Sequence, residues 1–283
     1  MQYLNLGCGR RYHPSWTNMD VAAHGPSVIG HDLSKGIPLP DASCDVVYHS
    51  NLLEHMRRAD AQRLMLECYR VLRAGGLLRV GVPDLEQISN LYLKKLNAAL
   101  SGDVHAGYDY EWMMLELYDQ TVREHSGGEM LRWLQQEPLL NEAFVYERIG
   151  EEGPGLVQTL KQQPSESSRQ TWRPPLAVLF HAFRILSASL RQRLIALLLG
   201  SADLHALEIG RFRLAGEVHQ WMYDRYSLAK LMLATGFRDP IEQTATKSQI
   251  PDWSSFNLDT LPSGTVIKPD ALFMEAVKPL EAS

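Results

Sequence analysis

Short apolar runs bounded by glycine, proline and aspartate divide roughly the first eighty residues into alternating strands and helices. Four of these runs predict buried strands, at Tyr3–Leu6, Thr17–Val21, Cys44–His49 and Leu77–Val82. Between the last two, Ala59–Leu72 repeats its apolar residues at helical spacing, and the glycines that follow predict the end of that helix. Strands that alternate with helices are typical of α/β proteins with a mainly parallel sheet.

A different pattern occupies the middle of the chain, where long helical periodicities replace the alternation. Strand and helix then alternate again, with a helix predicted at Ser227–Thr235 and a last strand at Ala271–Val277. We therefore predict a doubly wound, mainly parallel α/β core formed by residues 1–86 and 216–283. A large, mainly helical insertion, residues 87–215, interrupts this core.

Composition narrows the class of protein only slightly. The chain has 283 residues, 45% of them hydrophobic, and a formal net charge of −5, so its surface as a whole is not a nucleic-acid footprint. The three cysteines lack the spacing of metal ligands, and no metal site is predicted. The sequence has neither a secretory signal pattern nor an apolar run of membrane-spanning length, so we expect a cytoplasmic protein.

The first predicted strand ends in Gly7-Cys8-Gly9, a turn that lets a ligand approach the backbone because no Cβ intervenes at glycine. Asp20, at the end of the second strand, can accept hydrogen bonds from both hydroxyls of a ribose. A site for a nicotinamide dinucleotide typically has a third glycine, in the motif G-x-G-x-x-G, and an acidic residue about twenty residues after it. Tyr12 stands at the third position, and Asp20 follows Gly7 by only thirteen residues. The turn therefore favours a ligand that has a ribose but no pyrophosphate.

Five sequence motifs in order resemble the S-adenosylmethionine (SAM)-binding motifs of class I methyltransferases. They are Leu4-Asn5-Leu6-Gly7-Cys8-Gly9, then Asp20, then His31-Asp32-Leu33, then Leu39–Tyr48 followed by Leu53-Glu54-His55, and finally Glu67–Gly76. The resemblance covers residues 3–86 and, more weakly, residues from about 217 to 279. It implies a class I methyltransferase fold with SAM as cofactor.

The resemblance also implies eight cofactor contacts, which divide by the part of SAM they meet. Gly7, Cys8 and Gly9 would pass under the methionine, Asp20 would bind the ribose, Asp32 and Leu33 would contact the adenine, and His49 and Asn51 would line the methionine and sulfonium end. An alternative for Asp32 is a loop acid that caps a turn. The connection from Gly9 to Thr17 is too short for the usual crossover helix, so we expect a more open pocket or one that the insertion covers.

Transfer of the methyl group to a hydroxyl is helped by a base, for which the sequence offers two candidates. His219 lies in a His-x-Trp-x-Tyr-Asp stretch that resembles one in methyltransferases encoded among sugar and polysaccharide assembly functions. Asp84 follows the predicted strand Leu77–Val82, at the edge where the acceptor should lie. The alternatives are a buried, hydrogen-bonded histidine and a helix N-cap. Glu54 and His55 are expected to cap or orient the helix that follows them rather than to take part in the chemistry.

We therefore expect an O-methyltransferase whose acceptor is a small molecule, a sugar or a glycan intermediate. The alternative is a non-catalytic protein that keeps the fold and binds partners through its insertion. Residues 176–199 combine an apolar face with arginines and no acids, which is typical of a helix that contacts a membrane surface or an anionic carrier. The same face would equally suit packing against the core.

Overall fold

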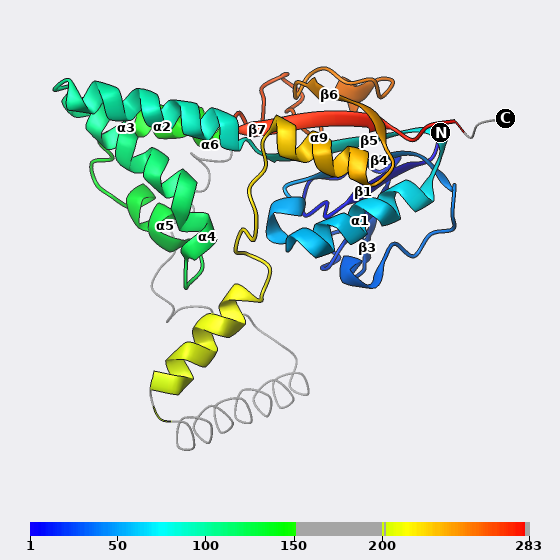
Figure 1. The fold of residues 1–283 in the computed structure, drawn as a ribbon, viewed down its shortest axis with the longest axis horizontal. Coiled ribbons are helices and arrows are strands. Elements are labelled where there is room, and N and C mark those ends of the chain that lie inside the picture. The colour runs from blue at the N-terminus through cyan, green and yellow to red at the C-terminus, as the bar shows by residue number, and fades with distance from the viewer. Residues whose placement is uncertain (151–199, 201, 281–283) are drawn as a thin grey trace.

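The computed structural model describes residues 1–150, 200 and 202–280 (Figure 1). Its centre is a seven-stranded sheet in the order β3-β2-β1-β4-β5-β7-β6. The strands are β1 (Tyr3–Leu6), β2 (Thr17–Asp20), β3 (Val28–Gly30), β4 (Cys44–Ser50), β5 (Leu72–Pro83), β6 (Arg238–Gln243) and β7 (Ala271–Val277). Only β7 runs antiparallel to its neighbours, and the strand order reverses between β1 and β4. The predicted α/β core with a mainly parallel sheet is confirmed.

Two helices cover one face of the sheet. They are α1 (Arg58–Val71) and α9 (Arg225–Ala234), whose apolar residues pack with those of the central strands into the largest core cluster. Asp224 begins α9 with a capping box, in which its side chain accepts a hydrogen bond from the backbone N–H of Ser227. These elements match the helices that the periodicity predicts.

The opposite face of the sheet carries an irregular cover in place of a helical layer. Trp16, Tyr48 and Trp253 lie edge to face in a separate core cluster there. The cover includes residues 244–270, whose one regular element is a 3₁₀ turn at Trp253–Phe256. The segment between β1 and β2 contains no helix, as its length predicts. The loops that replace the helices therefore line the carboxyl edge of the sheet on this face.

The described part of residues 87–215 is helical and projects beside the sheet (Figure 1). It contains α2 (Leu85–Leu100), α3 (Val104–Met114), a π-helical turn (Leu115–Asp119), α4 (Gln120–Val122), α5 (Gly128–Leu134) and α6 (Glu142–Ile149), and residues 202–213 form a further helix. Trp112 lies at the centre of the core of this segment, and a buried ion pair joins Arg148 to Glu116 at 2.6 Å. The division of the chain into core and insertion stays a prediction.

The predicted amphipathic segment 176–199 lies outside the described residues. Among the residues that are described, no helix is both long enough and apolar enough to cross a membrane.

Two local expectations differ from the structure. β3 was not predicted, because three residues are too few to show alternation. The helix α1 does not end at the glycines, since Leu72 is already extended and pairs with Cys44 of β4. Gly75 lies in the first part of β5, where its φ of +77° bends the backbone and its N–H donates to the carbonyl of Lys278. Pairing with neighbouring strands therefore decides where this helix ends.

Candidate cofactor and acceptor site

The glycine turn and Asp20 meet at the carboxyl edge of the sheet because β1 and β2 are parallel neighbours. Gly7 and Gly9 have φ values of +62° and +51°, in the left-handed region that favours glycine. A Cβ at Gly7 would also lie 3.0 Å from Cδ1 of Leu52. The Asp20 carboxylate accepts hydrogen bonds from the backbone N–H of Gly9 at 2.9 Å and of Ala22 at 3.0 Å. The turn and the acid are thus held against each other.

The larger of two cavities at this edge has a volume of about 720 Å³. Gly7, Asp20, Asp32 and Leu33 line it, as does the segment 213–216, where the chain leaves the helical region. This volume falls within the range of small-molecule sites, which is roughly 300–1,000 Å³. An adenosine group therefore fits between the two predicted acids and the segment that returns from the helices.

Asp32 occupies the wall of this cavity and also caps a turn. Its carboxylate accepts hydrogen bonds from the backbone N–H of Ser34 at 3.0 Å and from the Ser34 hydroxyl at 2.7 Å. These hydrogen bonds, with the charge of Lys35 nearby, hold the pKa of Asp32 below its ordinary value. The capping role left open by the sequence is therefore present, and it fixes the carboxylate beside the cavity.

The smaller cavity, of about 320 Å³, lies on the side of the sheet that the loops cover. Cys8, Gly9 and Asn51 of the predicted set line it, and Gly7 and His55 line both cavities. Further polar and charged residues in its wall are Asn5, Arg10, Arg11, Tyr48, Ser50, Asp259 and Lys268. A cofactor that extends over the glycine turn would place its ribose and adenine in the larger cavity and its amino-acid end in the smaller one.

His49 is the one predicted cofactor residue that lines neither cavity, and its cofactor role stays a prediction. Its side chain is fully buried, and neither ring nitrogen has a hydrogen-bond partner among the described residues. Burial lowers the pKa of His49 to about 3, so the ring is neutral. Side chains alternate along a strand, and in β4 the cavity receives Tyr48 and Ser50, the two residues on either side of His49.

Asp84 likewise lies outside the walls of both cavities. It is the N-cap of α2, where its carboxylate accepts a hydrogen bond from the backbone N–H of Glu86 at 3.0 Å. Burial raises the pKa of Asp84. The backbone N–H of Leu85 donates to the carbonyl of Tyr223, so the start of α2 is tied to the chain that returns from the helical region. The structure thus shows the capping role that the sequence left as the alternative for Asp84.

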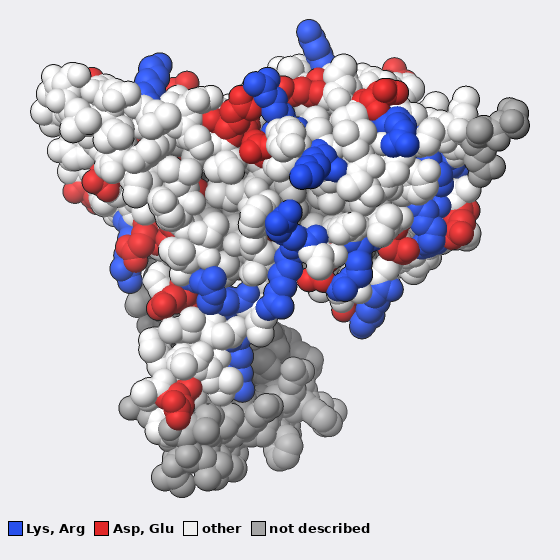
Figure 2. Space-filling model, viewed as in Figure 1, with Lys and Arg blue, Asp and Glu red and all other residues white. Residues whose placement is uncertain are grey.

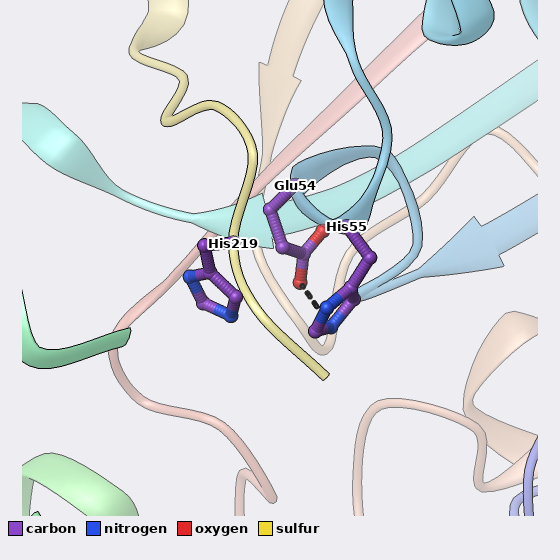
Figure 3. Close-up of side chains that lie close together, drawn as sticks. All are labelled: Glu54, His55 and His219. Atoms are coloured by element: carbon purple, nitrogen blue, oxygen red, sulfur yellow. Dashed lines mark ion pairs between the residues drawn. The ribbon is translucent and has the colours of Figure 1, made fainter. Parts of the chain in front are cut away.

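His219 lies in a buried cluster with Glu54 and His55 (Figure 3). The His55 and His219 rings meet edge to face with centroids 4.8 Å apart, and Nε2 of His55 is 3.9 Å from Oε1 of Glu54. Burial raises the pKa of Glu54 to about 7 and lowers the pKa of His219 to about 3. His55 brings this cluster into contact with both cavities. No motif or spacing in the sequence connects His219 with Glu54 and His55, because the two segments lie far apart along the chain.

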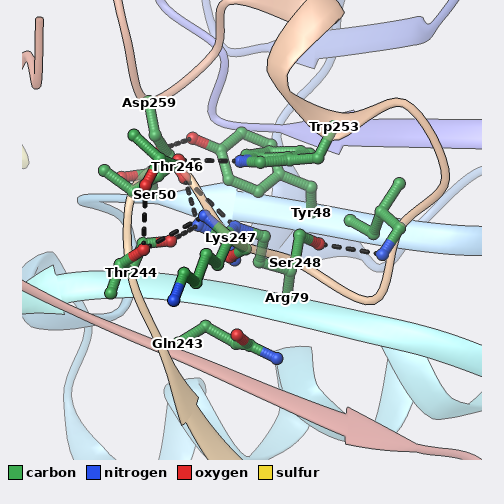
Figure 4. A network of polar contacts seen from close by, with 12 residues as sticks. Tyr48, Ser50, Arg79, Gln243, Thr244, Thr246, Lys247, Ser248, Trp253 and Asp259 are labelled. Atoms are coloured by element: carbon green, nitrogen blue, oxygen red, sulfur yellow. Dashed lines mark hydrogen bonds and ion pairs between the residues drawn. The ribbon is translucent and has the colours of Figure 1, made fainter. Parts of the chain in front are cut away.

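A second buried network supports the wall of the smaller cavity (Figure 4). Arg79 of β5 donates to Asp259 at 2.8 Å and to Glu275 at 2.8 Å, and the hydroxyl of Tyr48 donates to Asp259 at 2.5 Å. The guanidinium also lies over the ring of Trp253, 4.4 Å from its centroid. This network fixes Tyr48 and Asp259 in the cavity wall, and no sequence motif indicates it.

Positive side chains gather over α1 and α9 on the face shown in Figure 2, although the net charge is negative. Arg57, Arg63 and Arg213 contribute to the wall of the larger cavity next to this surface. The chain therefore presents a locally basic surface beside the predicted cofactor site.

Part of the chain that forms this edge of the sheet is similar to known methyltransferases. Residues 17–80 match the methyltransferase domain family. A probable S-adenosylmethionine-dependent methyltransferase of Mycolicibacterium smegmatis is 43% identical over 98 residues, which are 29% of this chain and 37% of that protein. Another from Mycobacterium tuberculosis is 50% identical over 48 residues, 17% of each chain. The chain thus spans less than half the length of the curated relatives it matches.

Among solved structures, a SAM-dependent methyltransferase of Thermotoga maritima, a possible histamine N-methyltransferase, aligns over 98% of this chain and 82% of that chain. The TM-score is 0.39 and the identity 12%. The sequence matches, taken with the strand order, confirm the predicted class I methyltransferase fold and S-adenosylmethionine as the cofactor. The predicted resemblance to sugar and polysaccharide methyltransferases and the roles of individual site residues stay predictions.

Proposed function

We propose that this chain transfers the methyl group of SAM to a hydroxyl of a small-molecule, sugar or glycan acceptor. One observation carries the proposal: seven of the eight predicted cofactor residues line two cavities that share Gly7 and His55. A cofactor bound over Gly7 would have its reactive centre near this junction. An acceptor would meet the methyl group at this junction, beside the amino-acid end of the cofactor in the smaller cavity.

SAM supplies a methyl group on a positively charged sulfur, and transfer is an in-line displacement. The contribution of the chain is mainly to position the acceptor oxygen, the carbon and the sulfur along one line. Polar groups at Ser50 and Asn51 in the wall of the smaller cavity would orient an acceptor hydroxyl. Residues 213–216 form part of the wall of the larger cavity, where they would shield one side of the cofactor from water.

His219 remains our proposed proton acceptor, in preference to Asp84. Burial lowers the pKa of His219 to about 3, so the ring is neutral at pH 7 but is by itself a weak base. In this proposal the neighbouring Glu54 carboxyl would stabilise the imidazolium that forms when the ring takes a proton. His219 reaches the junction through His55, whereas the Asp84 carboxylate is occupied at the start of α2. Removal of the acceptor proton at this cluster would make the oxygen a stronger nucleophile.

Support for an acceptor with an anionic carrier comes from the arginines beside the larger cavity and from the predicted basic helix at residues 176–199. In this proposal the segment 87–215 acts as a cap that selects the acceptor. The cap could meet a lipid-linked sugar phosphate at a membrane surface through that helix. Salt-sensitive binding to anionic vesicles, abolished when Arg184, Arg191 and Arg193 are replaced by glutamine, tests this role. Packing of the same helix against the core predicts no binding.

The deciding experiment incubates the purified chain with methyl-labelled SAM and a set of sugars, glycans and lipid-linked sugars. Label that appears in an acceptor, at an oxygen identified by mass spectrometry, supports the proposal. SAM binding without turnover on any acceptor class would favour the alternative of a non-catalytic protein that binds partners through its helical segment.

A further inference from the structure

We infer that Glu54, His55 and His219 form a binding site for a divalent first-row transition-metal ion of the Zn²⁺ class. The three side chains come from two segments far apart in the sequence and lie close together (Figure 3). His55 lines both cavities, whereas Glu54 and His219 lie behind it and line neither. Metal binding by this cluster does not depend on the methyl transfer proposed above, so the two proposals can fail separately.

The geometry needs only a small adjustment to hold an ion. One ligand atom from each residue lies within 4.8 Å of the others, and Nε2 of His55 is 3.9 Å from Oε1 of Glu54. Zinc binds imidazole nitrogen and carboxylate oxygen at about 2.0–2.2 Å, so ligand atoms around one ion lie roughly 3–4 Å apart. Shifts of the side-chain atoms on the order of 1 Å would therefore bring the three atoms to coordination distance.

Four buried polar atoms of the cluster have no hydrogen-bond partner among the described residues, which is the second observation that points to a ligand. Both carboxylate oxygens of Glu54 are buried without a hydrogen bond, as are Nδ1 of His55 and Nδ1 of His219, within the described part of the chain. Buried polar groups are nearly always hydrogen-bonded, and an unpaired buried carboxylate is costly. A bound cation would satisfy the carboxylate and both rings together.

The backbone holds the two segments in place. The N–H groups of Gln220 and Trp221 both donate to the carbonyl of Glu54, at 2.6 and 3.2 Å, and the N–H of His219 donates to the carbonyl of Gln120 at 2.8 Å. Metal sites require ligands whose positions are fixed by the surrounding structure. These hydrogen bonds fix the Cα atoms of the ligands while leaving the side chains free to close on an ion.

The ligand set selects the class of metal. Two imidazoles and one carboxylate suit Zn²⁺, Co²⁺, Fe²⁺ and Mn²⁺, whereas Mg²⁺ and Ca²⁺ favour sites made of oxygen alone. Three protein ligands also leave at least one coordination position, which lies next to His55 and therefore near both cavities. An acceptor hydroxyl bound there would lose its proton more easily. With an ion bound, His219 would be a ligand rather than a proton acceptor.

The test uses the purified full chain after removal of metals with a chelator. Zn²⁺ is titrated in competition with a chromophoric chelator, and Co²⁺ is titrated while its visible d–d absorption is recorded. We expect one equivalent of either ion to bind, and Mg²⁺ not to compete. Absence of a stoichiometric site in the folded wild-type chain, with neither Zn²⁺ nor Co²⁺ bound, would overturn the inference.

Variants assign the ligands. Glu54→Gln and His219→Gln should each weaken Zn²⁺ binding at least 10-fold, whereas the exposed counterparts Glu124→Gln and His125→Gln should leave it unchanged. His219→Cys keeps a metal ligand, so it should retain the ion and add a sulfur-to-cobalt charge-transfer band in the near ultraviolet. Circular dichroism confirms that each variant is folded. Equal affinity in Glu54→Gln, or the absence of that band in a folded His219→Cys chain, would contradict the assignment.

Discussion

Replacement of Asp20 by alanine tests the cofactor site most directly. The carboxylate lies in the wall of the larger cavity, where it would bind the two ribose hydroxyls. Hydrogen bonds to a charged group contribute about 1.5–3 kcal/mol each, and water compensates part of that on removal. A net loss of about 2–4 kcal/mol corresponds to a rise in the SAM dissociation constant of roughly 30- to 1,000-fold.

The same carboxylate accepts hydrogen bonds from the backbone N–H groups of Gly9 and Ala22, so Asp20→Ala should also loosen the glycine turn. Calorimetric titration with SAM measures the affinity, and urea unfolding separates it from stability. Asp32→Ala should lose less affinity, because it removes one contact to a neutral amino group, and the exposed Asp203→Ala serves as control. Affinity within twofold of wild type in a folded Asp20→Ala chain would refute the site.

Four further outcomes are expected. SAM at a hundred times its dissociation constant should stabilise the fold by about 2.7 kcal/mol and raise the melting temperature, whereas NAD should not; the reverse would exclude the methyltransferase assignment. His219→Ala should lower turnover roughly 10²–10⁴-fold with SAM affinity nearly unchanged, and a loss of turnover in Asp84→Asn alone would transfer the role of base to Asp84. Arg79→Met should lower the free energy of unfolding, measured with urea, by about 3–5 kcal/mol, because it leaves buried carboxylates, Glu275 among them, without their cationic partner. A decrease below about 1 kcal/mol would contradict the buried network. Hydrogen bonds from the Ser227 backbone lower the pKa of Asp224, so the carboxylate stabilises the fold above its unfolded pKa of about 3.9, and this effect is lost as pH falls through the lower folded pKa. The free energy of unfolding of Asp224→Ala should therefore depend less steeply on pH in acid. An unchanged pH dependence in acid would show that the cap does not contribute.

Much of the architecture could be predicted from the sequence because it depends on local patterns. Apolar runs of strand length and one well-defined helical period predict β1, β2, β4, β7 and α1 to within a residue or two. The carboxyl ends of parallel neighbours lie at one edge, so a glycine turn and an acid after the next strand must come together. The cofactor wall at Gly7 and Asp20 follows from that rule.

Tertiary structure alone decided which face a buried strand residue presents and which distant side chains meet. Both faces of β4 are buried, so its sequence does not show which side chains reach the cavity. In the structure Tyr48 and Ser50 line the smaller cavity, whereas His49 points to the other face of the sheet. Arg79 finds its partners 180 and 196 residues away, and Glu54 meets His219 only because the returning chain is hydrogen-bonded to its backbone. Contacts of this kind depend on how connections pass over the sheet, and no periodicity or spacing along the chain encodes that path.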